Sequence, residues 1–180
     1  MKEKKEKIIR RLLWAGVIIL IITLFVSTTM RLMKLAQSYQ SGILPNPKSI
    51  DYGYAKNPLL TLLHILPGLL FIVLGALQFV KKIRNKYIRF HRTSGRLYLV
   101  LGFIIGISSL AMAFAMQFGG WIETAAILVF APYFLFSLMN AYKYIRKKEF
   151  VLHREWMIRA YSIGIAVATM RPLRTYHGIY

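Results

Sequence analysis

Two stretches of the sequence share a pattern: a histidine followed at once by an arginine and, further on, an arginine two positions before a tyrosine. The first stretch occupies residues 91–98 (HRTSGRLY) and the second occupies residues 153–161 (HREWMIRAY). Neutral imidazole is the usual ligand of haem iron and of many divalent metals. His91 and His153 are therefore candidate ligands of a haem or a metal ion. The alternative is that both histidines lie at a membrane surface and contact lipid headgroups.

The residues around these histidines suit the same hypothesis. Arg96 and Arg159 could pair with the propionates of a haem. Tyr98 and Tyr161 could donate hydrogen bonds, and Gln78 falls at the same predicted level. Glycines on the facing helices would leave room for a flat macrocycle. A b-type haem is thus one cofactor that the pattern would fit, whereas the sequence assigns no catalytic residue.

A second polar level is predicted from three residues near the other ends of their helices, His64, Glu123 and Arg171. His64 could bind a second cofactor, a quinone carbonyl or a proton. It could equally form a hydrogen bond across the bundle to Glu123 or Arg171, which would make it structural. Pro67, one turn after His64, would bend the helix and shape any pocket there.

The composition restricts the class of protein that can use these residues. Of the 180 residues, 57% are hydrophobic and 17% are charged, which is more apolar than a soluble domain can bury. The absence of cysteine excludes a disulfide scaffold, thiolate catalysis and thiolate metal ligands. Motifs of soluble enzymes, such as a Walker loop or HExxH, do not occur. These features predict an integral membrane protein.

Runs without charged residues predict five transmembrane helices, since a span needs about 20 mostly apolar residues. Leu12–Met30 and Asn57–Val80 are uncharged. Leu97–Tyr142 has one charged residue and is divided into two helices by Gly119-Gly120, and a weaker fifth helix covers Trp156–Leu173. The expected fold is an all-α polytopic bundle. Its parts are a basic N-terminus and anchor helix (1–30), an extracytoplasmic loop (31–57), a four-helix bundle (58–175) and an external tail (176–180).

The basic residues predict which side of the membrane each segment faces. Residues 1–11, 81–96 and 143–159 hold 19 of the 25 Lys and Arg, and the other segments hold 6. Because basic residues accumulate on the cytoplasmic side, the N-terminus is predicted in the cytoplasm and the C-terminus outside the cell membrane. This topology, together with attraction to anionic headgroups on the cytoplasmic side, accounts for the net charge of +19, so nucleic acid is not an expected partner.

Helical periodicity predicts one inward face on each of three helices, and each face combines histidine with small residues. The faces consist of residues 64, 68, 71, 75 and 78, residues 91, 95, 98, 102 and 109, and residues 153, 157, 160, 164 and 171. The first helix is apolar all round and is expected to be peripheral. The second and third spans and the fourth and fifth spans could be two parallel copies of one hairpin, or their similarity could be chance.

With these motifs the chain resembles a family of bacterial predicted membrane proteins, the domain of unknown function 2306 family. The resemblance runs from about residue 58 to residue 172 and rests on the spaced HR-GR-Y and HR-WM-R-Y elements. The family's patterned positions coincide with the histidines and arginines named above, which favours a site over a set of membrane anchors. Because the family has no established activity, the resemblance implies a grouping and a fold and transfers no reaction.

Two classes of function remain open. The first is a histidine-lined site for a haem, a metal or a quinone, used in membrane electron transfer with a redox partner. The second is a non-enzymatic accessory or assembly protein whose arginine clusters bind anionic lipid or a partner subunit. A transporter is the weakest alternative, because five helices would have to oligomerise to form alternating halves.

Overall fold

The computed structural model is built from helices alone within the described residues, which are 2–47, 49–116 and 120–177. For residues 2, 3, 10 and 167–177 the structure describes the backbone and not the side chains. The all-helical class is therefore confirmed for this part of the chain. The helices are α1 (Lys2–Ser41), α2 (Ile50–Lys56), α3 (Pro58–Gln78), α4 (Lys81–Lys86), α5 (Ile88–Ala115), α6 (Gly120–Arg146) and α7 (Phe150–His177).

Four helices in the described part of the chain are long and apolar enough to cross a membrane, namely α1 over Lys4–Ser41, α3, α5 and α6. They contain the first four predicted spans. The fifth predicted span lies in α7, where the side chains from residue 167 onward are outside the described set. The count of five spans therefore stays a prediction.

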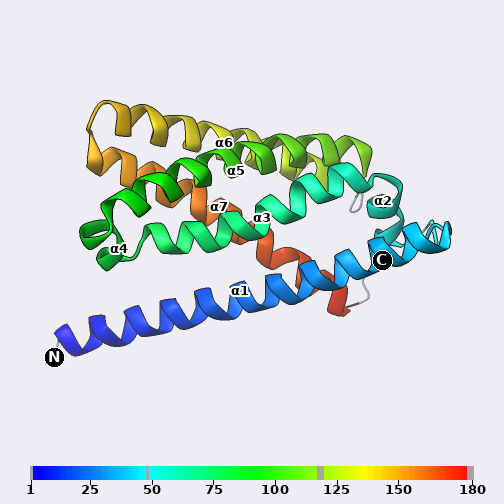
Figure 1. Cartoon of the computed structure of the whole chain (residues 1–180), viewed down its shortest axis with the longest axis horizontal. Helices are drawn as coiled ribbons and strands as arrows, with labels where there is room; N and C mark the ends of the chain where they lie inside the picture. The colour runs from blue at the N-terminus through cyan, green and yellow to red at the C-terminus, as the bar shows by residue number, and fades with distance from the viewer. Residues whose placement is uncertain (1, 48, 117–119, 178–180) are drawn as a thin grey trace.

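Four of the long helices form a closed ring. α3 packs against α5, α5 against α6, α6 against α7, and α7 against α3. α1 lies outside this ring, contacts α3 and α7, and runs along one side of the bundle (Figure 1). The first helix is thus peripheral, as its uniformly apolar sequence predicts.

Some helix boundaries differ from the predicted ones. α1 continues through residues expected in a loop and ends at Ser41, where Gly42 adopts a φ of 66°. Since neither Gly nor Pro interrupts residues 31–41, the helix persists until a residue that tolerates the left-handed conformation. α5 begins at Ile88, ahead of the predicted uncharged run that starts at Leu97. The predicted division between the third and fourth spans is confirmed, because α6 begins at Gly120, whose φ is 67°.

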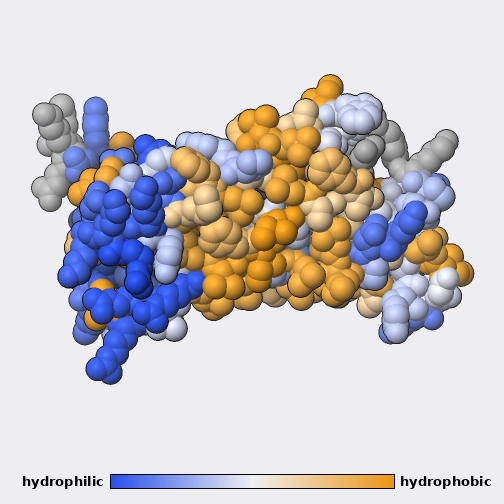
Figure 2. All heavy atoms as spheres, turned by 90° about the horizontal axis from the view of Figure 1, so that it is seen from above, coloured by the Kyte–Doolittle hydropathy of each residue, from blue (hydrophilic) through white to orange (hydrophobic). Residues whose placement is uncertain are grey.

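Polar and apolar surfaces separate along the long axis of the molecule. Figure 2 shows a broad apolar band between one strongly hydrophilic end and a second, less hydrophilic end. The start of α1, α4 and the connection between α6 and α7 all lie at the left of Figure 1, which corresponds to the strongly hydrophilic end of Figure 2. These are the three basic segments of the sequence, and we call this end the basic end. The band between the ends has the surface expected of protein in contact with lipid chains.

The centre of the ring is filled by large side chains from all four helices. Phe71 of α3, Tyr98 of α5 and Leu138 of α6 are completely buried, and Tyr161 of α7 is 7% exposed. The rings of Phe71 and Tyr98 stack with centroids 4.2 Å apart, and Phe71 meets Tyr161 at 6.4 Å. We call these four residues the central plug. It separates the basic end of the ring from the opposite half.

Candidate functional site

The inward faces predicted from helical periodicity are confirmed for the members that the structure buries, whereas the side chain of residue 171 is outside the described set. They bring side chains of α3, α5 and α7 to one shared interior. The members of these faces that the structure buries are Phe71, Gly75, Gln78, Tyr98, Gly102, Met157 and Ala160.

On these faces Gly75 and Gly164 accommodate neighbouring side chains, whereas the nearest atom to an added Cβ at Gly68 is 4.0 Å away. A Cβ at Gly75 would lie 2.3 Å from a ring carbon of Tyr161 and 2.9 Å from one of Tyr98. A Cβ at Gly164 would lie 2.8 Å from the ring of Phe71. The space expected for a flat macrocycle is therefore occupied by the central plug, and the residues beside these glycines do not fit a haem.

Gly102 and Gly106 likewise make room for side chains of α6 against α5. A Cβ at Gly102 would lie 2.6 Å from Leu138, and one at Gly106 would lie 2.5 Å from Leu135. This pair of small residues therefore serves packing within one chain.

His91 and His153 lie together at the basic end, on helices that face each other diagonally across the ring. His153, Arg84 and Arg92 are all close enough for their charges to act on the His91 imidazole. The Nδ1 atom of His153 lies 2.8 Å from the carbonyl oxygen of Ala141. Because a carbonyl only accepts hydrogen bonds, Nδ1 carries the proton and Nε2 is the atom that could bind a ligand. The Nδ1 atom of His91 is buried and has no hydrogen-bond partner among the described residues.

Among the described residues, these two histidines have no third protein ligand that would complete a metal site. Within the described residues, no group of three or more His, Asp or Glu side chains could hold a metal ion. Gln78, predicted at the same level, donates from Nε2 to Ser94 Oγ at 2.8 Å, and Ser94 donates to the carbonyl of Phe90. The glutamine therefore links α3 to α5.

The two candidate tyrosines belong to the central plug. The Tyr161 hydroxyl donates to the carbonyl of Ile72 at 2.9 Å. The Tyr98 hydroxyl is buried without a hydrogen-bond partner in the described part of the chain. Both rings therefore contribute to helix packing. Of the two hydroxyls, that of Tyr98 is the one whose hydrogen-bond donor has no partner among the described residues.

The two candidate arginines lie on the outside of the ring. Arg96 and Arg159 are both exposed. The Arg159 guanidinium lies 4.6 Å from the centroid of the Trp156 ring, and Glu155 forms a loose ion pair with it at 3.6 Å. Trp156 in turn packs edge-on against Phe136 at 5.5 Å. Aromatic and basic side chains in this arrangement are typical of a membrane–water interface.

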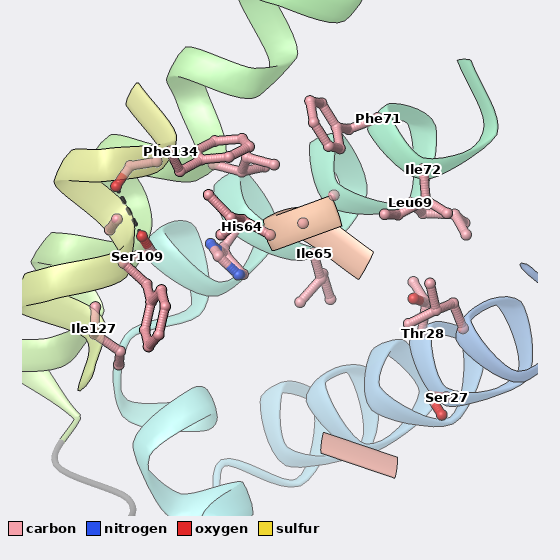
Figure 3. Close-up of a pocket in the computed structure, with 18 of the residues that line it drawn as sticks. Ser27, Thr28, His64, Ile65, Leu69, Phe71, Ile72, Ser109, Ile127 and Phe134 are labelled. Atoms are coloured by element: carbon pink, nitrogen blue, oxygen red, sulfur yellow. Dashed lines mark hydrogen bonds between the residues drawn. The ribbon is translucent and has the colours of Figure 1, made fainter. Parts of the chain in front are cut away.

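A cavity of about 240 Å³ lies beyond the central plug, toward the end opposite the basic end. Its wall is mainly aliphatic and aromatic, with contributions from Ile65, Leu69 and Phe130. Figure 3 shows Thr28 of α1 opposite Leu69 of α3 across this space. We call it the His64 cavity.

Polar side chains from several helices also line the cavity. They are Ser27, Thr28, Arg31, Tyr54, His64, Ser109 and Glu123. The Nδ1 atom of His64 lies 3.0 Å from Ser108 Oγ, which orients the imidazole. Two members of the predicted second polar level, His64 and Glu123, therefore share one cavity. The side chain of the third, Arg171, is outside the described residues.

The contact between α1 and α2 closes one end of the cavity. Arg31 forms an ion pair with Asp51 of α2, and its guanidinium lies 4.2 Å from the centroid of the Tyr54 ring. Lys34 pairs with the same carboxylate at 2.8 Å. These interactions hold the second half of α1 against α2.

Sequence reasoning missed the part that α1 plays in the cavity. Ser27, Thr28 and Arg31 project from a helix expected to be only peripheral. A signal for it exists, because Ser27-Thr28-Thr29 interrupts an otherwise apolar run. Periodicity alone does not predict which face of such a helix is turned inward, since apolar residues lie on all its sides.

A family model described as a predicted membrane protein (DUF2306) matches residues 61–177, more than half of the chain. The matched region contains α5, α6 and α7 and most of α3, whereas α1 and α2 precede it. No curated protein and no solved structure matches the chain.

Proposed function

The chain belongs to the DUF2306 family of predicted membrane proteins, and we propose that it binds a quinone in the His64 cavity and uses it in membrane electron transfer. The observation that carries this proposal is the cavity itself, an apolar space of about 240 Å³ with polar side chains on part of its wall. Sites for small amphipathic molecules have this composition, in which a few polar groups orient the ligand.

The wall offers partners for both parts of a quinone headgroup. Phe71, Phe130 and Phe134 provide aromatic surface for its ring. His64 provides an imidazole, which donates or accepts a hydrogen bond according to its tautomer. It therefore suits the carbonyl of the quinone as well as the hydroxyl of the quinol.

Reduction of a quinone to a quinol consumes two electrons and two protons. Glu123, which lines the same cavity as His64, is a second group able to take up or release a proton. The electrons would be exchanged with a separate protein electron carrier. In this proposal His64 and Glu123 bind and protonate the headgroup.

The proposal includes the complete predicted topology. In this topology the protein has five spans with α7 as the last, the N-terminus lies in the cytoplasm and the C-terminus lies outside. The gathering of the three basic segments at one end supports this orientation. The pairing of α3 with α5 and of α6 with α7 supports two parallel hairpin copies. The His64 cavity would then lie in the outer half of the membrane.

Binding of a radiolabelled short-chain quinone to the detergent-purified protein tests the proposal. His64→Ala should weaken binding about tenfold, the loss expected for one hydrogen bond to a ligand. Leu63→Ala, on the exposed side of the same helix, is the matched control and should bind normally. His91→Ala, at the basic end, should also bind normally. Wild-type protein that binds no quinone would overturn the proposal, as would equal binding by His64→Ala and Leu63→Ala.

A second function is favoured by the exposed arginines at the basic end. We propose that Arg159, held over the ring of Trp156, binds the phosphate of anionic phospholipids as part of an accessory or assembly role. Co-purified lipid measured by mass spectrometry tests this. Arg159→Gln should lose anionic lipid relative to Lys5→Gln, a control that removes one charge from the same end. Unchanged lipid in Arg159→Gln would contradict the role.

A further inference from the structure

A second cavity lies beneath α1, nearer the basic end. It has a volume of about 220 Å³ and is lined by Leu13, Trp14, Val17, Ala76, Phe79 and Tyr161. We call it the Trp14 cavity. It thus lies between α1 and the ring helices α3 and α7.

Both cavities lie under one face of α1. Trp14 and Val17 line the Trp14 cavity, while Leu24, Thr28 and Arg31 line the His64 cavity. The spacing of these residues, by three, seven, four and three positions, places them on a single side of a helix. From Trp14 to Arg31 this side is about 25 Å long. The two cavities therefore follow one another along the same seam between α1 and the ring.

Apolar side chains of α1 lie in the seam between the cavities. Leu20 and Ile21 of α1 pack there against the core of the ring. Over its apolar window α1 has no buried residue, and exposed residues such as Ile18, Ile19 and Ile22 cover its other sides. A helix with so little buried surface can move away from the ring more easily than the ring helices can separate.

We propose that the seam beneath α1 holds the apolar tail of the ligand whose headgroup occupies the His64 cavity. The ligand class is then a long-chain lipid quinone, with its tail extending past Leu20 and Ile21 into the Trp14 cavity. This inference rests on the proposed function and adds the substrate class. Lipid chains are as apolar as the seam, so the tail gains affinity mainly by filling the Trp14 cavity, whose lining side chains have fewer contacts while it is empty.

Competition binding with a short-chain and a long-chain quinone tests the inference. Wild-type protein should bind the long-chain quinone about tenfold more tightly, a modest gain because only packing contacts distinguish the two. Val17→Phe, which fills the Trp14 cavity, should abolish this difference and leave short-chain binding unchanged. Ile18→Phe is the matched control, since Ile18, next to Val17 in the sequence, is 53% exposed. This variant should keep the preference for the long-chain quinone.

The outcomes separate the two proposals. If neither quinone binds, the proposed function fails. If both bind equally well, or if Val17→Phe keeps the long-chain preference, the tail site is overturned and the headgroup site stands. Should Val17→Phe fail to fold, a long-chain quinone with a brominated tail gives a second measurement. The brominated tail should quench the fluorescence of Trp14, so the quenching should be smaller in Trp14→Phe. If Trp14→Phe is quenched as much as the wild type, the tail site is also overturned.

Discussion

Replacement of Gly75 by alanine tests the central plug directly. The added Cβ would lie 2.3 and 2.5 Å from two ring carbons of Tyr161 and 2.9 Å from one of Tyr98. Cβ atoms in proteins essentially never approach other atoms to less than 3.0 Å, so at least one ring must move. Neither ring can turn freely, because both meet Phe71 in the centre of the bundle.

The size of the effect follows from two opposing terms. Overpacking a core costs about 1–3 kcal/mol, and contacts with two aromatic rings place Gly75→Ala near the upper value. Alanine regains up to about 1 kcal/mol through its higher helix propensity. We therefore expect the free energy of unfolding to fall by about 2 kcal/mol. Gly16→Ala on α1 is the matched control, since nothing lies within 4 Å of its added Cβ. Its stability should be unchanged or slightly higher.

Denaturant unfolding in detergent, followed by circular dichroism, measures both variants. A double-mutant cycle with Tyr161→Ala isolates the clash, because without the ring the cost of Gly75→Ala should largely disappear. Equal stability of Gly75→Ala and Gly16→Ala would refute the packing of the plug. So would a cost that stays the same with and without the ring of Tyr161.

Four further outcomes follow from the same structure. Tyr161→Phe loses a hydrogen bond to a backbone carbonyl and should lower the free energy of unfolding by about 1 kcal/mol. Tyr98→Phe removes a buried hydroxyl without a partner among the described residues and should leave the free energy of unfolding unchanged or raise it. Unfolding in detergent that finds Tyr98→Phe less stable than Tyr161→Phe would contradict both expectations. The chain has no cysteine, so an impermeant maleimide should label Ser41→Cys in intact cells and Lys5→Cys only after permeabilisation; labelling of both from outside would disprove the topology. Protein expressed with added haem should lack a Soret band, since side chains fill the space at Gly75, Gly102 and Gly164; a band that vanishes in His91→Ala would reverse that conclusion.

The inward faces could be predicted from the sequence because they depend only on local geometry. A helix repeats every 3.6 residues, so the residues that share a face with Phe71 or Tyr98 are fixed by position alone. Small residues mark the same faces, since they allow helices to approach closely. The burial of Gly75, Gln78 and Met157 follows from these two rules.

The meaning of the glycines could not be predicted in the same way. A glycine at position 75 admits either a cofactor or a large side chain from the next helix. Which of the two occurs depends on the residues at the same height on α5 and α7, and that height is set by how the helices shift along their axes. Here Tyr98 and Tyr161 arrive at the level of Gly75. The sequence contains both tyrosines but not the axial register that brings them there.

The His64 cavity has a similar origin. His64 and Glu123 could be identified as polar residues near the same end of their helices. Their common cavity depends on α1, whose Leu24 and Thr28 supply one wall. The ion pair of Arg31 with Asp51 joins the second half of α1 to α2, and these two residues are 20 positions apart in the sequence. No periodicity links such residues, so the wall could not be foreseen.

The central plug also bears on which ligand the His64 cavity can serve. Phe71 lies on the wall of the cavity and is itself completely buried, stacked on Tyr98 toward the basic end. A solute that entered the cavity would have to displace packed rings to reach the other side of the membrane. A molecule that enters and leaves from the lipid, past the loosely held α1, needs no such movement. The packing therefore favours a ligand that diffuses within the bilayer, such as a quinone, over the aqueous substrate of a transporter.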